Sequence, residues 1–275
     1  MSQVNPGRAL YSPEEAEFLS KMEKKWARYN REKVEAIRSQ LGPVDSLLEI
    51  GCGSGQILKG LARDVPKLVG VDEKVERLEN ASKNCPVAKL ICAKAEELEF
   101  QDEFDVVLTS QMLHEVKQFG TIHQMSEILR AIWNAIKPGG RYFLLDHIDP
   151  GEGRVIIEVP NSIKQILLEF KSKFLLRSVW IKKLGKSLYE IERRDLQDFV
   201  TKTWSFNSPM EDMEMKETHA SFSKEEVEGM VRKVGFSPTR FITFTGIEND
   251  LRDHQIELKE EVPWDRKFLL VSLKP

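Results

Sequence analysis

The sequence lacks three features that would each point to a particular class of protein. It has only three cysteines, Cys52, Cys85 and Cys92, and they show neither a CxxC spacing nor a Cys/His spacing typical of a metal site. No apolar run approaches the roughly 18 residues that a membrane span requires. Residues 1–15 contain no apolar stretch of the kind found in signal peptides. We therefore expect a cytoplasmic protein with reduced thiols.

The chain also lacks a strong charge of either sign. Its 41 Lys and Arg nearly balance 44 Asp and Glu, so no single field extends over the molecule to capture a nucleic acid. A DNA partner is not expected. With 275 residues, of which 41% are apolar, the chain can bury one large core. One elaborated α/β domain is favoured over two independent domains.

Short apolar runs alternate with helical patterns through the first half of the chain. Strands that alternate with helices are typical of parallel crossovers. A helix over 224–234 then precedes two β-rich runs, which we expect to pair as an antiparallel edge. The sequence predicts a doubly wound, seven-stranded, mostly parallel sheet with an antiparallel final hairpin. The predicted strands are 46–50, 67–72, 88–92, 104–108, 141–146, 239–245 and 267–273.

Four regions follow from this pattern. Residues 1–43 form a helical N-terminal cover, with a helix predicted over 13–40. Residues 44–149 form a Rossmann-like core. Residues 150–220 form a helical lid insertion that the alternation does not need, and residues 221–275 return to complete the core.

A glycine turn follows the first predicted strand. Its sequence is Gly51-Cys52-Gly53-Ser54-Gly55, and a helical segment begins at Gln56. Glycines let the backbone pass close to a ligand, and the start of a helix offers free N–H groups. A dinucleotide site would have its third glycine where Gln56 stands, so the turn disfavours a nicotinamide enzyme.

Asp72 ends the second predicted strand, 17 residues beyond Gly55. A carboxylate at that point can accept hydrogen bonds from both hydroxyls of a ribose. It can also cap the helix that follows. The two roles are compatible, and together with the glycine turn they favour a nucleoside-containing cofactor.

These segments resemble the class I S-adenosylmethionine-dependent methyltransferases. Leu47 to Gly55 is similar to the first motif of that family, and Val69 to Asp72 to the second. Ala95 to Leu98 resembles the adenine-side motif, Phe104 to Val107 the fourth strand, and Lys137 to Gly140 the turn before strand five. The resemblance is close over about residues 40–147.

The resemblance implies a set of cofactor-binding residues. Glycines of the turn would line the methionine part of S-adenosylmethionine, Glu49 would support the turn and Asp72 would hold the ribose. Lys94 departs from the acid that the family often has before the Ala-Glu pair, which leaves the adenine contact to the backbone near Ala95. The implied set is Glu49, Gly51, Cys52, Gly53, Gly55, Asp72, Ala95, Glu96, Ser110 and Gln111.

Candidate catalytic residues follow strands four and five, whose carboxyl ends form the ligand edge of such a sheet. His114, Glu115 and His147 are the candidates for a base that deprotonates the acceptor, and Asp146 lies beside them in sequence. The five histidines form no HxxxH or HxH pair and no cysteine joins them, so the sequence predicts no metal requirement, with Asp146 and Asp149 as the fallback site for a hard cation.

The expected reaction is methyl transfer to a small acceptor by in-line displacement. The residues after strand four, Thr109 to Met112, lack the Asn-Pro-Pro-Tyr type of loop used for planar amines, and no Pro-Cys pair follows. Two alternatives stay open, namely a methyltransferase acting on RNA, protein or a lipid at an anionic surface, and a binding protein that holds the cofactor without transfer.

The insertion carries the evidence for the surface alternative. Between 163 and 187 it has seven Lys and Arg and one acid, Glu169. Ile163, Phe170 and their neighbours form one helical face, and an apolar stripe is predicted from Trp180 to Leu188. We expect a lid that contributes Trp180, Trp204 and Phe206 to the acceptor pocket, with contact to anionic lipid through 163–187 as the alternative.

Overall fold

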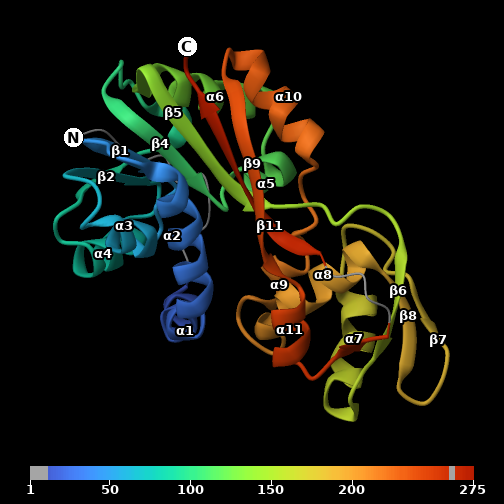
Figure 1. Cartoon of the computed structure of the whole chain (residues 1–275). Coiled ribbons are helices and arrows are strands. Elements are labelled where there is room, and N and C mark those ends of the chain that lie inside the picture. Colours follow the sequence, from blue (N-terminus) through green and yellow to red (C-terminus); the bar gives the residue numbers. More distant parts are fainter. Residues whose placement is uncertain (1–11, 260–263) are drawn as a thin grey trace.

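The computed structural model describes residues 12–259 and 264–275 (Figure 1). Eleven strands and eleven α-helices lie in this part, with two short 3-10 helices at Ala95–Glu97 and Thr203–Ser205. The strands are β1 Ser46–Ile50, β2 Lys67–Asp72, β3 Lys89–Cys92, β4 Phe104–Ser110, β5 Ile136–His147, β6 Arg154–Glu158, β7 Ile181–Lys183, β8 Leu188–Glu192, β9 Ser237–Gly246, β10 Glu257–Leu258 and β11 Asp265–Leu273. The helices are α1 Pro13–Lys25, α2 Ala27–Leu41, α3 Gln56–Leu61, α4 Val75–Asn84, α5 Leu113–Phe119, α6 Ile122–Ala135, α7 Asn161–Lys173, α8 Arg193–Lys202, α9 Glu211–Glu214, α10 Lys224–Val234 and α11 Glu248–Asp253.

The main sheet has seven strands in the order β3-β2-β1-β4-β5-β11-β9. Strands β1 to β5 pair in parallel, while β11 runs antiparallel to both β5 and β9. The order reverses between β1 and β4, which is the point where ligands bind in open sheets of this kind. The predicted doubly wound sheet with an antiparallel final hairpin is confirmed.

Alternate residues of the sheet face two separate apolar layers. On β1, Leu48 packs in a cluster with α6 and α10, whereas Leu47 packs in a cluster with α2 and α3. The same alternation holds on β5 for Leu144 and Phe143. Because both faces of a parallel strand are covered, its sequence is apolar throughout rather than alternating. This arrangement leaves the polar residues at the strand ends, where the site forms.

The insertion contains strands in addition to the helices predicted from the sequence. Beside α7 and α8 it holds a second antiparallel sheet, ordered β10-β6-β8-β7. Its strands alternate buried and less buried side chains. In β6, for example, Val155 and Ile157 are buried, and the residues between and beside them are less so. Over five residues this period of two is too short to stand out among charged neighbours. The stripe from Trp180 to Leu188 belongs to a strand pair and not to a helix.

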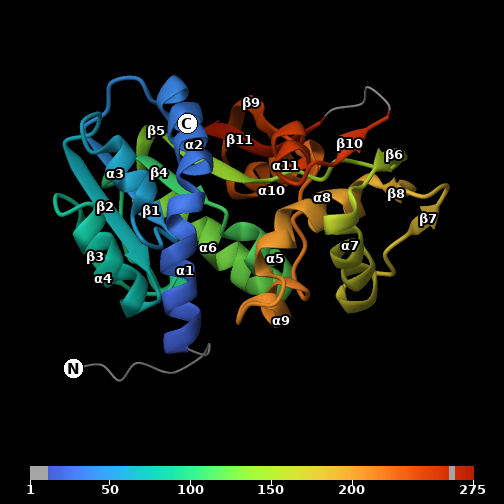
Figure 2. The ribbon, with the colours of Figure 1, turned by 90° about the horizontal axis from the view of Figure 1, so that it is seen from below.

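The insertion has its own hydrophobic core, built around Phe170, Tyr189 and Phe199. Part of the C-terminal region joins that core, because α11 and β10 leave the main sheet after β9 and pack there before β11 returns. Figures 1 and 2 show this smaller unit beside the carboxyl ends of the large sheet. The predicted leader helix is two helices, α1 and α2, and α2 packs on α3.

Candidate active site

A cavity of about 970 Å³ opens at the carboxyl ends of β1, β2, β4 and β5. The sheet supplies its floor, α1 and α2 line one side, and α8, α9 and the segment 217–219 of the insertion line another. A cavity at the upper end of the range for small-ligand sites, placed where the strand order reverses, is the expected location of a cofactor site.

The glycine turn lies at one end of this cavity. Gly51 and Gly53 have φ angles of +73° and +53°, a region that side chains disfavour. A Cβ on Gly51 would also meet Cγ of Met112 at 3.0 Å. The N–H groups of Gly51 and Cys52 both donate to the carbonyl of Val71, which ties the turn to β2. The turn therefore presents bare backbone to the cavity.

Gly55 has a different role from the one implied by the resemblance. It does not contribute to the lining of the cavity, and a Cβ there would meet Cβ of Ala81 at 3.0 Å. Gly55 is the N-cap residue of α3 and has a φ of +72°. Packing of the turn against α4 therefore accounts for this glycine without a cofactor contact.

Asp72 connects the turn to the second strand. Its side chain is 6% exposed, and its two oxygens accept hydrogen bonds from the N–H groups of Gly53 (2.8 Å) and Lys74 (3.0 Å). A carboxylate has about four acceptor positions, so two bonds leave capacity for ribose hydroxyls. Asp72 thus ties the turn to the residue before α4 without being the cap of that helix, which is Lys74, and its free acceptor positions allow the ribose role.

Glu49 lies beneath the turn and is nearly fully buried. Burial raises its pKa to about 8, although the nearby Lys33 opposes the rise. Burial likewise lowers the pKa of Lys33 to about 8. Both side chains line the cavity, and one carboxyl oxygen of Glu49 has no hydrogen-bond partner among the described residues. This pair offers polar contacts for the charged end of an amino acid.

The residues predicted for the adenine side also line the cavity. Ala95 and Glu96 line the cavity in the 3-10 helix after β3, and Glu96 accepts a hydrogen bond from the side chain of Gln124 at 3.0 Å. Lys94 lines the cavity beside them. The side chain of Glu96 is therefore held by α6.

Buried acidic and basic groups lie at the opposite end of the cavity. His114 of α5 is 4% exposed, and both ring nitrogens contact carboxylates: Nδ1 lies 2.6 Å from Asp146 and Nε2 lies 2.7 Å from Glu217. Burial alone would lower the pKa of His114, but the two carboxylates raise it well above the usual value. The two carboxylates therefore favour the protonated form of His114, whereas a base requires the neutral form.

Two more histidines stack beside it. The rings of His147 and His219 are nearly parallel with centroids 4.2 Å apart, and the centroid of His114 lies 5.0 Å and 5.8 Å from them. Burial and the neighbouring positive groups hold the pKa of each ring of the stacked pair well below its usual value. Both rings are therefore neutral at neutral pH.

Gln111 fixes one side of His147. Its side-chain amide lies 2.7 Å from Nε2 of His147, while Nδ1 of His147 and Nδ1 of His219 are buried without a hydrogen-bond partner among the described residues. Gln111 itself has a φ of +52° at the end of β4. A non-glycine residue in that region is unusual and is commonly found at functional sites.

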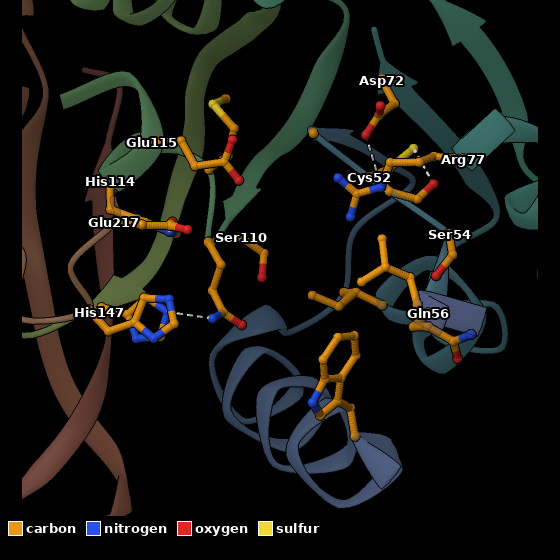
Figure 3. Close-up of a pocket in the computed structure, with 18 of the residues that line it drawn as sticks. Cys52, Ser54, Gln56, Asp72, Arg77, Ser110, His114, Glu115, His147 and Glu217 are labelled. Atoms are coloured by element: carbon orange, nitrogen blue, oxygen red, sulfur yellow. Dashed lines mark hydrogen bonds and ion pairs between the residues drawn. The ribbon is translucent and has the colours of Figure 1, made fainter. Parts of the chain in front are cut away.

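The turn and this polar group lie on opposite sides of one cavity (Figure 3). Of the predicted site residues, all except Gly55 line it, including Cys52, Ser110, Glu115 and His147. The sequence missed His219 and Glu217, which come from the insertion some 100 residues after His114. Their local sequence, Glu217-Thr218-His219, carries no recognisable spacing, so only the tertiary fold reveals them.

Comparisons with known proteins agree with this geometry. Residues 48–144 match the family model of the methyltransferase domain. The chain contains a class I S-adenosylmethionine-dependent methyltransferase domain. Its cofactor is S-adenosylmethionine, and the bare turn, Asp72 and the unpartnered oxygen of Glu49 fit the polar groups of that molecule.

An uncharacterized methyltransferase of Synechocystis sp. is 36% identical over 107 residues, which cover 38% of this chain and 49% of that protein. The chain thus spans about half the length of this relative. A TehB-like methyltransferase structure from Corynebacterium glutamicum has a TM-score of 0.54 at 12% identity and covers 96% of this chain and 100% of that chain. The N-methyltransferase NodS from Bradyrhizobium japonicum, in complex with S-adenosyl-L-homocysteine, has a TM-score of 0.52 at 12% identity, with 90% and 87% covered. These structures share the fold of the methyltransferase domain.

The structure also bears on the predicted aromatic lining of the acceptor pocket and on the predicted cation pair. Of Trp180, Trp204 and Phe206, only Trp204 lines the cavity, since Phe206 packs in the core of the insertion and Trp180 lies under Arg154. The fallback pair for a hard cation does not form a site, because Asp149 pairs with Arg194 and Asp146 with His114. Within the described residues, no helix has the length and apolarity needed to cross a membrane.

Proposed function

We propose that this protein transfers the methyl group of S-adenosylmethionine to a small polar acceptor bound between the glycine turn and the buried histidines. The observation that supports this most is the single cavity shared by both groups, which the insertion narrows with residues of α8, α9 and 217–219. A cavity of about 970 Å³ suits a cofactor together with a small molecule better than it suits a folded macromolecule.

The residues of the turn would hold the cofactor. Gly51 and Gly53 admit the methionine part to the backbone, Asp72 accepts the ribose hydroxyls, and Ala95 and Glu96 face the adenine. S-adenosylmethionine supplies an activated methyl group: as the acceptor's electron pair bonds to that carbon, the carbon–sulfur pair stays on sulfur and leaves S-adenosylhomocysteine. Positioning of the two reactants can supply several kcal/mol of the barrier.

On the acceptor side, the chain's own residues would orient the acceptor and take its proton. Ser110, Gln111 and the buried histidines offer hydrogen bonds that orient a polar acceptor, and Ser110 Oγ is buried without a partner among the described residues. Glu115 lies on the same side of the cavity and is our candidate to take the proton that the acceptor loses (Figure 3). We retain the cytoplasmic location in this proposal, which the three unpaired cysteines support.

A second candidate is action at an anionic lipid surface. Leu168, Leu175, Leu176 and Leu184 of the insertion are each more than 40% exposed, and Lys182, Lys183 and Lys186 are exposed nearby. Exposed leucines beside lysines are typical of a surface that meets anionic headgroups. The acceptor would then be a lipid that enters the cavity past the insertion.

One labelling experiment separates these functions. A cell extract is divided into low-mass, lipid, protein and RNA fractions, and each is incubated with the protein and S-adenosylmethionine carrying a labelled methyl group. We expect label in a low-mass product, identified by mass spectrometry. The triple variant Lys182→Gln, Lys183→Gln, Lys186→Gln serves as a control and should keep that turnover. Label confined to lipid and lost in the triple variant would contradict the small-acceptor proposal, as would label confined to protein or RNA.

A further inference from the structure

The histidine cluster, defined here as His114, His147, His219 and Glu217, has the composition of a metal site. The three histidines can each bring one ring nitrogen within 4.8 Å of the other two, and the cluster draws on α5, β5 and the end of the insertion. Three imidazoles with one carboxylate are the ligands that zinc and neighbouring divalent transition metals prefer. The alternative, a network held by hydrogen bonds alone, leaves two of these rings incompletely bonded.

Those unsatisfied atoms are the second observation. Nδ1 of His147, a residue only 2% exposed, and Nδ1 of His219 are both buried and lack a hydrogen-bond partner among the described residues. A buried polar nitrogen without a partner costs free energy, and most native proteins avoid it. Two such nitrogens on adjacent neutral rings are what a metal ion would satisfy.

Asp146 and Gln111 position the rings of His114 and His147. Asp146 lies 2.6 Å from Nδ1 of His114, so it can keep the proton there and leave Nε2 for the ion. Such a carboxylate commonly orients a histidine that binds a metal. Gln111 places its amide nitrogen 2.7 Å from Nε2 of His147, which holds that ring in place.

The acidic groups beside His114 and the spacing of the ligand atoms also favour a metal ion. Two carboxylates, Asp146 and Glu217, contact one buried imidazole, so acidic groups lie beside the position that we assign to the ion. His114 Nε2 and Glu217 lie 2.7 Å apart, and ligand atoms of a tetrahedral site with bonds near 2.0 Å are separated by roughly 3.3 Å. For an ion to bind, Glu217 must move slightly and the parallel rings of His147 and His219 must turn so that one nitrogen of each points at the ion.

We propose that the histidine cluster binds one divalent transition-metal ion, of which Zn²⁺ is the representative, at the acceptor end of the cavity. The ion's catalytic role rests on the proposed function, whereas the site itself does not. An acceptor oxygen that binds the ion has a lowered pKa, so it meets the methyl group as an oxyanion at neutral pH. The acceptor class is therefore a hydroxyl or enol compound that can coordinate a metal. This inference replaces the sequence-based prediction that no metal is needed.

Metal binding is tested on the full-length protein after removal of metals with a chelator. Titration with Zn²⁺ followed by calorimetry should give one ion per chain, and Co²⁺ should give the visible absorption bands of a tetrahedral or five-coordinate site. Zn²⁺ should also raise the thermal unfolding temperature, because a ligand that binds only the folded state stabilises it. Mg²⁺ should compete poorly, since it prefers oxygen ligands.

Variants locate the site. His219→Ala should weaken Zn²⁺ binding by more than about 100-fold and remove the Co²⁺ bands, because a ligand is lost and even partners of ligands are worth 10- to 100-fold. His219 is less buried than His147, so this variant is the better choice for retaining the fold. His123→Ala is the matched control, since His123 is exposed on α6 and pairs with Glu127 of the same helix, away from the cavity. Stripped protein that binds no Zn²⁺, or a His219→Ala variant that binds it as tightly as the parent, would overturn the site.

The experiments distinguish failure of the metal's role from failure of the proposed function. Methyl transfer that continues at full rate in stripped protein with chelator present would contradict the metal's role while the proposed function stands. Zn²⁺ bound at the cluster, with no extract fraction accepting methyl, would contradict the proposed function while the metal site stands. Calorimetry with S-adenosylhomocysteine on the stripped protein, which should still bind, shows in either case that the cofactor end is intact.

Discussion

Asp72→Ala should weaken binding of S-adenosylmethionine and S-adenosylhomocysteine by about 10- to 150-fold. Loss of a hydrogen bond to a charged group costs about 1.5 to 3 kcal/mol, and the variant loses the ribose contacts together with the bond that holds Gly53. Both ligands should be affected alike, because they share the ribose and the amino acid. Calorimetric titration of the two ligands measures the effect.

Two further variants serve as the negative and positive controls for that result. Glu79→Ala removes an exposed acid from the same helix that follows Asp72 and should leave both affinities unchanged. Gly53→Val should abolish binding, because a branched side chain is strained at a φ of +53° and a Cβ there would meet the guanidinium of Arg77 at 2.8 Å. If Asp72→Ala bound the ligands as well as the parent, its assignment to the ribose would be wrong.

Arg177→Met should lower the free energy of unfolding by about 3 kcal/mol. The guanidinium bonds Asp195 at 2.8 Å and Asp198 at 2.7 Å, and both carboxylates are fully buried. Removal of one partner of a buried ion pair costs about 3 to 5 kcal/mol, and the lower end applies because Arg177 is 27% exposed. Thermal or urea unfolding measures the change.

The same substitution should also reduce turnover, because Asp198 accepts hydrogen bonds from the N–H of His219 and the hydroxyl of Thr218. Loss of Arg177 loosens the segment that carries His219 and Glu217 into the cavity. Arg154→Met is the control: it loses an exposed 3.9 Å pair with Glu192 and an exposed contact with the Trp180 ring, so the stability change should stay within about 1.5 kcal/mol. Equal destabilisation by both variants would show that the buried network does not hold the insertion.

The cofactor end of the site was predictable from the sequence because its determinants are local. The glycine turn, the strand before it and Asp72 all lie within 27 residues of one another, from Ser46 to Asp72. The apolar runs of a doubly covered parallel sheet also stand out against their polar flanks. The helix boundaries at Lys224 and Val234 were also predictable, because they coincide with a Ser cap and a following Gly.

The acceptor end was not predictable for the opposite reason. His114, His147 and Glu217 come from three regions of the chain, and no local spacing marks them as partners. A search for short motifs could not bring these residues together, because only the tertiary fold places them side by side. The insertion was predicted to be helical because α7 has a clear apolar face, while β6, β7 and β8 are short and rich in charge.

A crystal structure with S-adenosylhomocysteine bound tests the central claim, that one cavity holds the cofactor at the glycine turn and the acceptor at the histidine cluster. The account predicts ribose hydroxyls on Asp72, the amino-acid part against Gly51 and Gly53, and the sulfur directed across the cavity toward His114 and His147. A cofactor bound elsewhere, or bound with its sulfur directed away from the cluster, would contradict it.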